Sequence, residues 1–293
     1  MAESAGTGTA GTGTAGNDTA GPDTTGNDTA GTDGAGIVAP AAERAAAAAM
    51  FGPALPQAER YADLLAGAGV ERGLIGPAEA GRIWDRHLLN CGAIARLVPA
   101  ECLIVDVGSG AGLPGIVLAL LLPRARVTLL EPMARRVDFL RECVAELGLA
   151  NAEVMRGRAE DLAGELAADV VTARAVAPLD RLAGLCLGLV RPAGRILAMK
   201  GSGAEAELAR ALPVLARLGV TDAKVVHSSD ASGTVTATVV TFSAPEHPGP
   251  GARAQGGTGR GGGSRARSGG KRRMGDGPHL GRAGRPNSRR GGG

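Results

Sequence analysis

The chain has 293 residues, a net charge of +3 and 44% hydrophobic residues, so its middle is long enough to bury a core. Its four cysteines form no Cys-x-x-Cys pair and its four histidines add no cluster, which predicts that there is no zinc site. No basic segment followed by a long apolar stretch begins the chain, and its apolar runs are too short to cross a bilayer. We therefore expect a cytoplasmic protein with no membrane or metal partner. We also expect a monomer, although no pattern in the sequence fixes the oligomeric state.

The first hundred residues divide into two segments. Residues 1–50 are mostly Gly, Thr, Ala and Asp in loose repeats, and because they have little to bury we predict a disordered tail. Residues 51–100 are predicted to form a small helical segment. Within it Arg86 and His87 follow Arg82 at helical spacing, and we expect this face to contact RNA. A histidine that only packs in the core is the alternative.

A glycine-rich loop follows the first predicted strand, at residues 102–107. Gly108, Gly110 and Gly112 precede a predicted helix that begins near Pro114. Glycine permits positive φ and close approach to a ligand, and proline suits the first turn of a helix. The strand, turn and helix together predict a site for a nucleotide-like small molecule.

Two acidic residues favour one class of cofactor. Glu131 lies 23 positions after Gly108 and ends the second predicted strand, where a carboxylate accepts ribose hydroxyls in S-adenosylmethionine and NAD sites alike. Asp106, just before the loop, suits a cationic amino-acid portion and would repel a pyrophosphate. The pair favours S-adenosylmethionine, and an NAD(P)-dependent oxidoreductase on a similar sheet remains an open alternative.

Strands and helices alternate through residues 101–244, which predicts an α/β fold with a doubly wound, mostly parallel sheet. The last two strands have no helix between them and predict an antiparallel C-terminal hairpin. Lys200 ends the fifth strand, and we expect it to contact a phosphate or a guanine carbonyl; a lysine without a role is the alternative. The predicted strands lie at 102–107, 126–131, 153–156, 169–175, 194–200, 223–227 and 234–242, and the helices at 114–121, 134–147, 179–190 and 204–217.

Five motifs occur in order along this region: Arg82–Asn90, Asp106–Gly115, Leu129–Leu140, Gly157–Glu160 and Thr172–Pro178. Together, from about Gln57 to Phe242, the sequence closely resembles the RsmG (GidB) family of bacterial small-subunit ribosomal RNA methyltransferases. The resemblance implies a class I S-adenosylmethionine-dependent methyltransferase fold, and methyl transfer from that cofactor to N7 of one guanine in 16S rRNA. Because guanine N7 carries an in-plane lone pair, we predict no catalytic acid or base.

The resemblance also implies roles for individual residues. Leu113 matches a position around the glycine loop, Glu160 a position on the adenine side, and Arg174 the boundary between cofactor and guanine. From the residues alone, Glu160 is more typical of a helix N-terminus and Arg174 of a surface ion pair, and the resemblance reverses both readings. The predicted cofactor-binding residues are Asp106, Gly108, Leu113, Glu131, Ala159, Glu160 and Arg174, and the predicted RNA contacts are Arg86, His87 and Lys200.

The last segment, residues 245–293, is predicted to be a second disordered tail. From residue 249 onward it holds ten Arg and one Lys against one Asp, a net charge of +10. Segments rich in Arg and Gly attract RNA through its phosphates with little sequence preference, although a passive linker is the alternative. A further open reading is a non-catalytic RNA-binding ribosome-assembly factor whose affinity comes from this tail.

Deleting residues 249–293 tests the tail. We expect weaker RNA binding at low salt and a shallower salt dependence, by about 0.7–0.9 in log–log slope for each phosphate that the tail neutralises, because counterion release drives such binding. Titration of labelled RNA at several salt concentrations measures both quantities. A truncated protein that keeps the full-length slope would show that the tail is a passive linker.

Overall fold

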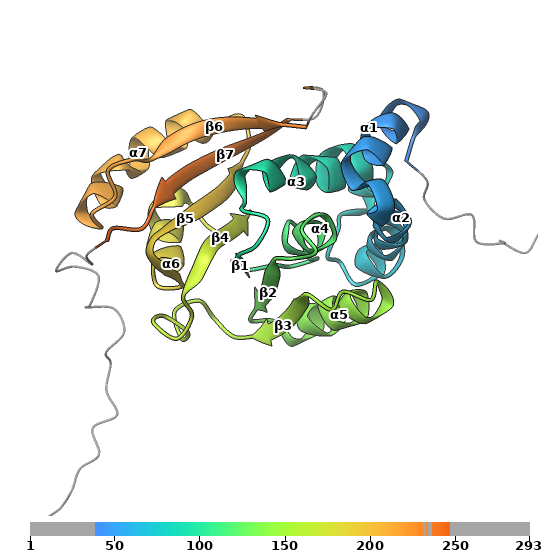
Figure 1. Ribbon diagram of the computed structural model, residues 1–293, viewed down its shortest axis with the longest axis horizontal. Coiled ribbons are helices and arrows are strands. Elements are labelled where there is room, and N and C mark those ends of the chain that lie inside the picture. Colours follow the sequence, from blue (N-terminus) through green and yellow to red (C-terminus); the bar gives the residue numbers. More distant parts are fainter. Residues whose placement is uncertain (1–38, 231–232, 234–235, 247–293) are drawn as a thin grey trace, which may run out of the picture.

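The computed structural model describes residues 39–230, 233 and 236–246, and within them the chain folds around a seven-stranded sheet (Figure 1). The strand order is β3-β2-β1-β4-β5-β7-β6, with β1 to β5 parallel and β7 antiparallel to both β5 and β6. This confirms the predicted mostly parallel sheet with its C-terminal hairpin. The strands are β1 (Leu103–Val107), β2 (Arg126–Glu131), β3 (Ala152–Arg156), β4 (Ala168–Arg174), β5 (Val190–Lys200), β6 (Lys224–Ser229) and β7 (Thr236–Ser243).

Helices cover both faces of the sheet, and each face has its own core. Along β1 and β4, Ile104 and Val170 face one core while Val105 and Val171 face the other, as the two-residue period of a strand requires. Among the helices of the described residues, none is long and apolar enough to cross a bilayer. The helices that follow the strands are α4 (Gly115–Leu121), α5 (Ala134–Glu146), α6 (Leu179–Leu187) and α7 (Ala204–Arg217).

The N-terminal helical segment packs over β1 and α4, on the same face as α5 (Figure 1). Its anchor on the glycine loop is Tyr61, the one tyrosine of the sequence, which is fully buried and donates a hydrogen bond of 2.7 Å to the Ala111 carbonyl. The segment comprises α1 (Ala41–Phe51), η1 (Gly52–Ala54), α2 (Leu55–Leu64), η2 (Leu65–Gly69), η3 (Pro77–Arg82), η4 (Ile83–Leu89), α3 (Asn90–Gly92) and η5 (Ala93–Leu97).

The predicted boundary between the N-terminal tail and the helical segment is wrong. Helix α1 begins at Ala41, so the last ten residues of the predicted tail over 1–50 are helical. Alanine is the best helix former, and its small side chain lets α1 approach η4 closely, with Ala47 buried. Phe51 then meets the Trp84 ring edge-on, at 6.2 Å between centroids. The remaining parts of the two predicted tails, residues 1–38 and 247–293, lie outside the described residues.

Candidate functional site

The glycine loop joins β1 to α4 at the carboxyl edge of the sheet. Gly108 has φ of +64°, and a Cβ built there would lie 2.9 Å from Cγ2 of Val176 in the segment after β4. Its backbone N–H donates to the Leu130 carbonyl of β2 at 2.8 Å, which holds the loop against the neighbouring strand. Both the backbone angle and the lack of space therefore require glycine at this position.

The carboxylate of Asp106 lies beneath this loop and is 1% exposed. Its Oδ2 accepts hydrogen bonds from the Ser109 hydroxyl at 2.7 Å and the Gly115 backbone N–H at 3.0 Å. Its Oδ1 accepts from the Thr172 hydroxyl of β4 at 2.9 Å. Burial raises the pKa of Asp106 to about 6, although these three donors favour the ionised form. Asp106 thus binds the loop, the start of α4 and β4 together, and its direct contact with a cofactor remains a prediction.

Glu131 ends β2 and is also 1% exposed, but it lines a cavity of about 390 Å³ beside the loop. Its Oε2 accepts from the Gly110 N–H and its Oε1 from the Met133 N–H, each at 3.0 Å. Each carboxylate oxygen has a second lone pair, so both can accept a further hydrogen bond from a ligand hydroxyl.

Of the predicted cofactor residues, four line this cavity: Gly108, Glu131, Ala159 and Glu160. The other three do not. Leu113 packs in the core beside α4, Asp106 lies under the loop, and Arg174 turns toward η4. The cavity is nevertheless bounded by residues 175–177, which follow Arg174 directly.

The cavity also has walls that the sequence analysis did not identify. Met133 and Val176 are 41% and 36% exposed, unusual for large apolar side chains, and both line the cavity. Exposed apolar surface of this kind suits a flat aromatic ring. The position of Met133, two residues after the predicted ribose acid, is the signal that identifies it in the sequence.

A larger hollow, of about 570 Å³, lies at the opposite edge of the sheet. It is lined by the amino-terminal ends of β1, β2 and β3, and none of the predicted site residues is among its lining. Ligands in open α/β sheets bind at the carboxyl ends of the strands, so the smaller cavity beside the glycine loop is the candidate site.

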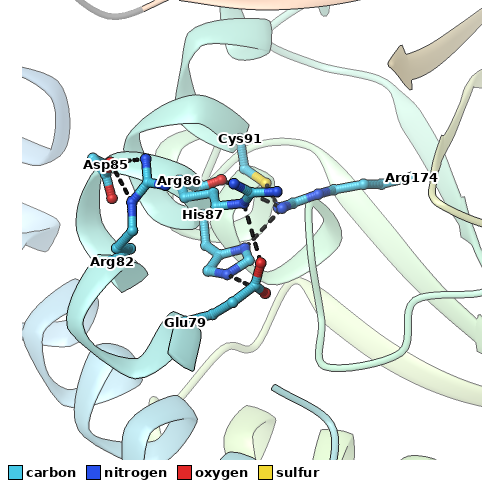
Figure 2. Close-up of polar contacts among 7 residues, drawn as sticks. All are labelled: Glu79, Arg82, Asp85, Arg86, His87, Cys91 and Arg174. Carbon is cyan, nitrogen blue, oxygen red and sulfur yellow. Dashed lines mark hydrogen bonds and ion pairs between the residues drawn. The ribbon is translucent and has the colours of Figure 1, made fainter. Parts of the chain in front are cut away.

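Three predicted residues from two distant parts of the sequence, Arg86 with His87 and Arg174, meet at one place (Figure 2). Arg174 donates from Nη2 to His87 Nδ1 at 2.7 Å and to the Arg86 carbonyl at 3.3 Å. Its Nη1 donates to the Cys91 sulfur at 3.1 Å. Glu79 lies behind them, with Oε1 3.1 Å from Arg86 Nε and Oε2 3.2 Å from His87 Nε2. Arg174, Arg86 and His87 were predicted from the sequence, whereas Glu79 and Cys91 were not.

Lys200 makes contacts within the protein. Its Nζ donates to Glu207 Oε1 on α7 at 2.8 Å and to the Ala177 carbonyl at 3.1 Å. Glu207 Oε1 also accepts from the Leu179 N–H at 2.8 Å. Lys200 therefore fixes the segment after β4, which lines the cavity, and its contact with RNA stays a prediction. Within the described residues, no group of His, Cys, Asp and Glu is arranged to hold a metal ion.

Comparison with known proteins places residues 54–235, which include the candidate site, in one family. Residues 54–235 match the GidB family model, described as rRNA small subunit methyltransferase G. A protein named ribosomal RNA small subunit methyltransferase G from Thermobifida fusca is 57% identical over 59% of this chain and 73% of its own length. The protein of the same name from Salinispora tropica is 50% identical over 72% of this chain and 93% of its own.

Similarity to solved structures is lower. An S-adenosylmethionine-dependent methyltransferase from Aquifex aeolicus is 16% identical, with a TM-score of 0.44, and covers 60% of this chain and 97% of that one.

Substituting Gly108 tests the cavity as a cofactor site. We expect Gly108→Val to weaken binding of S-adenosylhomocysteine by about tenfold or more, because the new side chain meets Val176 and fills the cavity edge. Isothermal titration calorimetry gives the affinities.

The matched control is Gly73→Val, since Gly73 has φ of +65° with no atom within 4 Å of an added Cβ. It imposes the same backbone strain away from the cavity and should leave the affinity unchanged. Equal affinities for wild type and Gly108→Val would refute the assignment.

Proposed function

The chain belongs to the rRNA small subunit methyltransferase G family, and we propose that it transfers the methyl group of S-adenosylmethionine to N7 of a guanine in 16S rRNA. The observation that carries this proposal is the cavity at the carboxyl edge of the sheet, which is lined by Gly108 of the glycine loop, by Glu131 and by residues 175–177 directly after Arg174.

The residues of the cavity fit S-adenosylmethionine. The buried Glu131 carboxylate retains acceptor capacity for the two ribose hydroxyls. Met133, Val176 and Ala159 offer apolar surface for the adenine ring, and Glu160 adds a carboxylate at the same cavity. Gly108 gives the amino-acid portion close access to the backbone. When bound, the cofactor supplies an electrophilic methyl group on a sulfonium sulfur.

The start of α4 argues against a dinucleotide cofactor. In dinucleotide sites the pyrophosphate binds at the N-terminus of the helix that follows the glycine loop. Here the Gly115 N–H at the start of α4 already donates to the buried Asp106 carboxylate. A pyrophosphate bound here would find the Gly115 N–H already hydrogen-bonded and would lie close to the Asp106 carboxylate. The NAD(P)-dependent oxidoreductase is therefore the weaker alternative.

The chemistry requires orientation of the reactants rather than proton transfer. The guanine N7 lone pair forms the new N–CH₃ bond as the S–CH₃ bond breaks, so no proton has to leave first. The protein then has two tasks, which are to align the two atoms and to favour the developing purine cation. The carboxylates of Glu131 and Glu160 at the cavity supply negative charge, and Arg174 offers donors to an acceptor oxygen.

RNA would approach over a basic surface. Arg136, Arg158 and Arg181 line the same cavity. Arg136 lies 3.8 Å from Glu131, whereas the charges of Arg158 and Arg181 would attract phosphates and help to orient the strand. We place the reaction in the cytoplasm, where bacteria keep ribosomal RNA, and propose that the protein acts as a monomer. Light scattering of the purified full-length chain measures its mass in solution and so its oligomeric state.

Mapping the methylated nucleotide tests the proposed function. Incubation with labelled S-adenosylmethionine and either 30S subunits or 16S rRNA is expected to give N7-methylguanosine at a single position, because one site orients one base. Reverse-transcription mapping after cleavage at N7-methylguanosine locates it.

Methylation at another atom would refute the N7 assignment. RNA binding without any methyl transfer would instead favour the ribosome-assembly factor, and binding of NADPH with no affinity for S-adenosylhomocysteine would favour the oxidoreductase.

A further inference from the structure

We propose that His87 and Glu79 are positioning residues for methyl transfer: His87 holds the Arg174 guanidinium as a neutral acceptor, and Glu79 fixes the proton of His87 on its far nitrogen. This inference rests on the proposed function, because Arg174 is taken to contact the cofactor or the RNA. It concerns three side chains in contact: Glu79 on η3, His87 on η4 and Arg174 at the end of β4 (Figure 2).

The contact between Arg174 and His87 fixes the tautomer. A guanidinium carries five N–H donors and no acceptor, so His87 Nδ1, 2.7 Å from Arg174 Nη2, must accept. The proton of the neutral ring is therefore on Nε2. That nitrogen lies 3.2 Å from Glu79 Oε2, an ion-pair distance without hydrogen-bond alignment, and the carboxylate favours an N–H on the side facing it.

The surroundings keep His87 neutral. It is 4% exposed, and burial followed by the Arg174 charge lowers its pKa below the ordinary value of 6.5, while Glu79 acts in the opposite direction. The charged groups that face the ring are Arg174 from β4, Glu79 from η3 and Arg86 from its own helix η4. The two cations together with burial outweigh the single carboxylate.

The protein holds the Arg174 guanidinium in place without using all of its N–H donors. Its three contacts, to His87, Cys91 and the Arg86 carbonyl, use three of the five N–H groups. The other two have no partner among the residues that the structure describes. A guanidinium held at one end with free donors is suited to an acceptor oxygen of the cofactor or the RNA, because less side-chain entropy is lost when it binds.

Protonation of His87 would break this arrangement. An N–H on Nδ1 would point at the N–H of Arg174 and place two cations in contact. The Cys91 contact cannot compensate, because burial raises the pKa of the Cys91 thiol to about 11 and a neutral thiol sulfur is a weak acceptor. Arg174 would lose its strongest contact at acid pH, and we expect kcat to fall as pH falls through the pKa of His87.

Two substitutions of His87 separate positioning from packing. His87→Asn keeps an acceptor near the position of Nδ1 but cannot titrate, whereas His87→Leu keeps apolar volume and has no acceptor. We expect kcat on 30S subunits to fall about 10–100-fold in His87→Leu and to remain within about threefold of wild type in His87→Asn. In His87→Asn, kcat should no longer fall as the pH is lowered. The matched control is His227→Asn, an exposed histidine on β6, which should change nothing.

Nuclear magnetic resonance of the imidazole nitrogens tests the same contacts without any turnover. The full-length chain has four histidines, so comparison with His87→Asn assigns the signal of His87. We expect the Nε2–H tautomer and a pKa below 6.5, a higher pKa in Arg174→Met and a lower one in Glu79→Gln. Glu146→Gln, which removes the surface ion pair with Arg60, should not shift it.

The outcomes are distinguishable. A wild-type protein that methylates no ribosomal RNA would overturn the proposed function, while the nitrogen spectra would still report on the Arg174–His87–Glu79 chain. An Nδ1–H tautomer, or a pKa of His87 unchanged in Arg174→Met, would overturn the inference, as would equal kcat values in His87→Leu and His87→Asn.

Discussion

The arrangement of the site depends on one buried carboxylate. Asp106 is almost wholly removed from water, and a buried charge is tolerated only where donors surround it. Its donors come from three places: Ser109 in the loop, Gly115 at the start of α4, and Thr172 in β4. One side chain therefore sets the position of the loop relative to two strands and a helix. The same bonds occupy the helix terminus that would otherwise favour an anion.

The parallel sheet brings the other components to the same edge. The chain leaves β1 at Gly108, β2 at Glu131 and β4 at Arg174, and parallel strands place their carboxyl ends side by side. The N-terminal helices then reach this edge by a buried contact from Tyr61 to the loop and a partly buried one between His87 and Arg174. Methyl transfer to an atom with a free lone pair needs alignment above all, and a sheet edge stiffened from both sides supplies it.

The strands and the position of the site could be predicted from sequence, since alternation and glycine spacing are local signals. Strand β2 runs over the predicted residues 126–131, and Glu131 lies in the cavity as its place at the strand end implies. Side-chain direction was not predictable. Nothing local indicates that Asp106 turns under the loop, or that Glu207 meets Lys200. The contact of Arg174 with His87 joins residues 87 apart, and only the fold brings them together.

The role of Asp106 can be measured as the affinity for S-adenosylhomocysteine between pH 5 and 8. Because burial raises the pKa of Asp106 to about 6 and its loop contacts favour the ionised form, the wild-type affinity should be constant above that pH. It should fall by up to about tenfold per pH unit below it. Asp106→Asn, which has no charge to lose, should bind more weakly and show no such dependence. A wild-type affinity that stays flat down to pH 5, or a variant that binds as wild type does, would contradict the account.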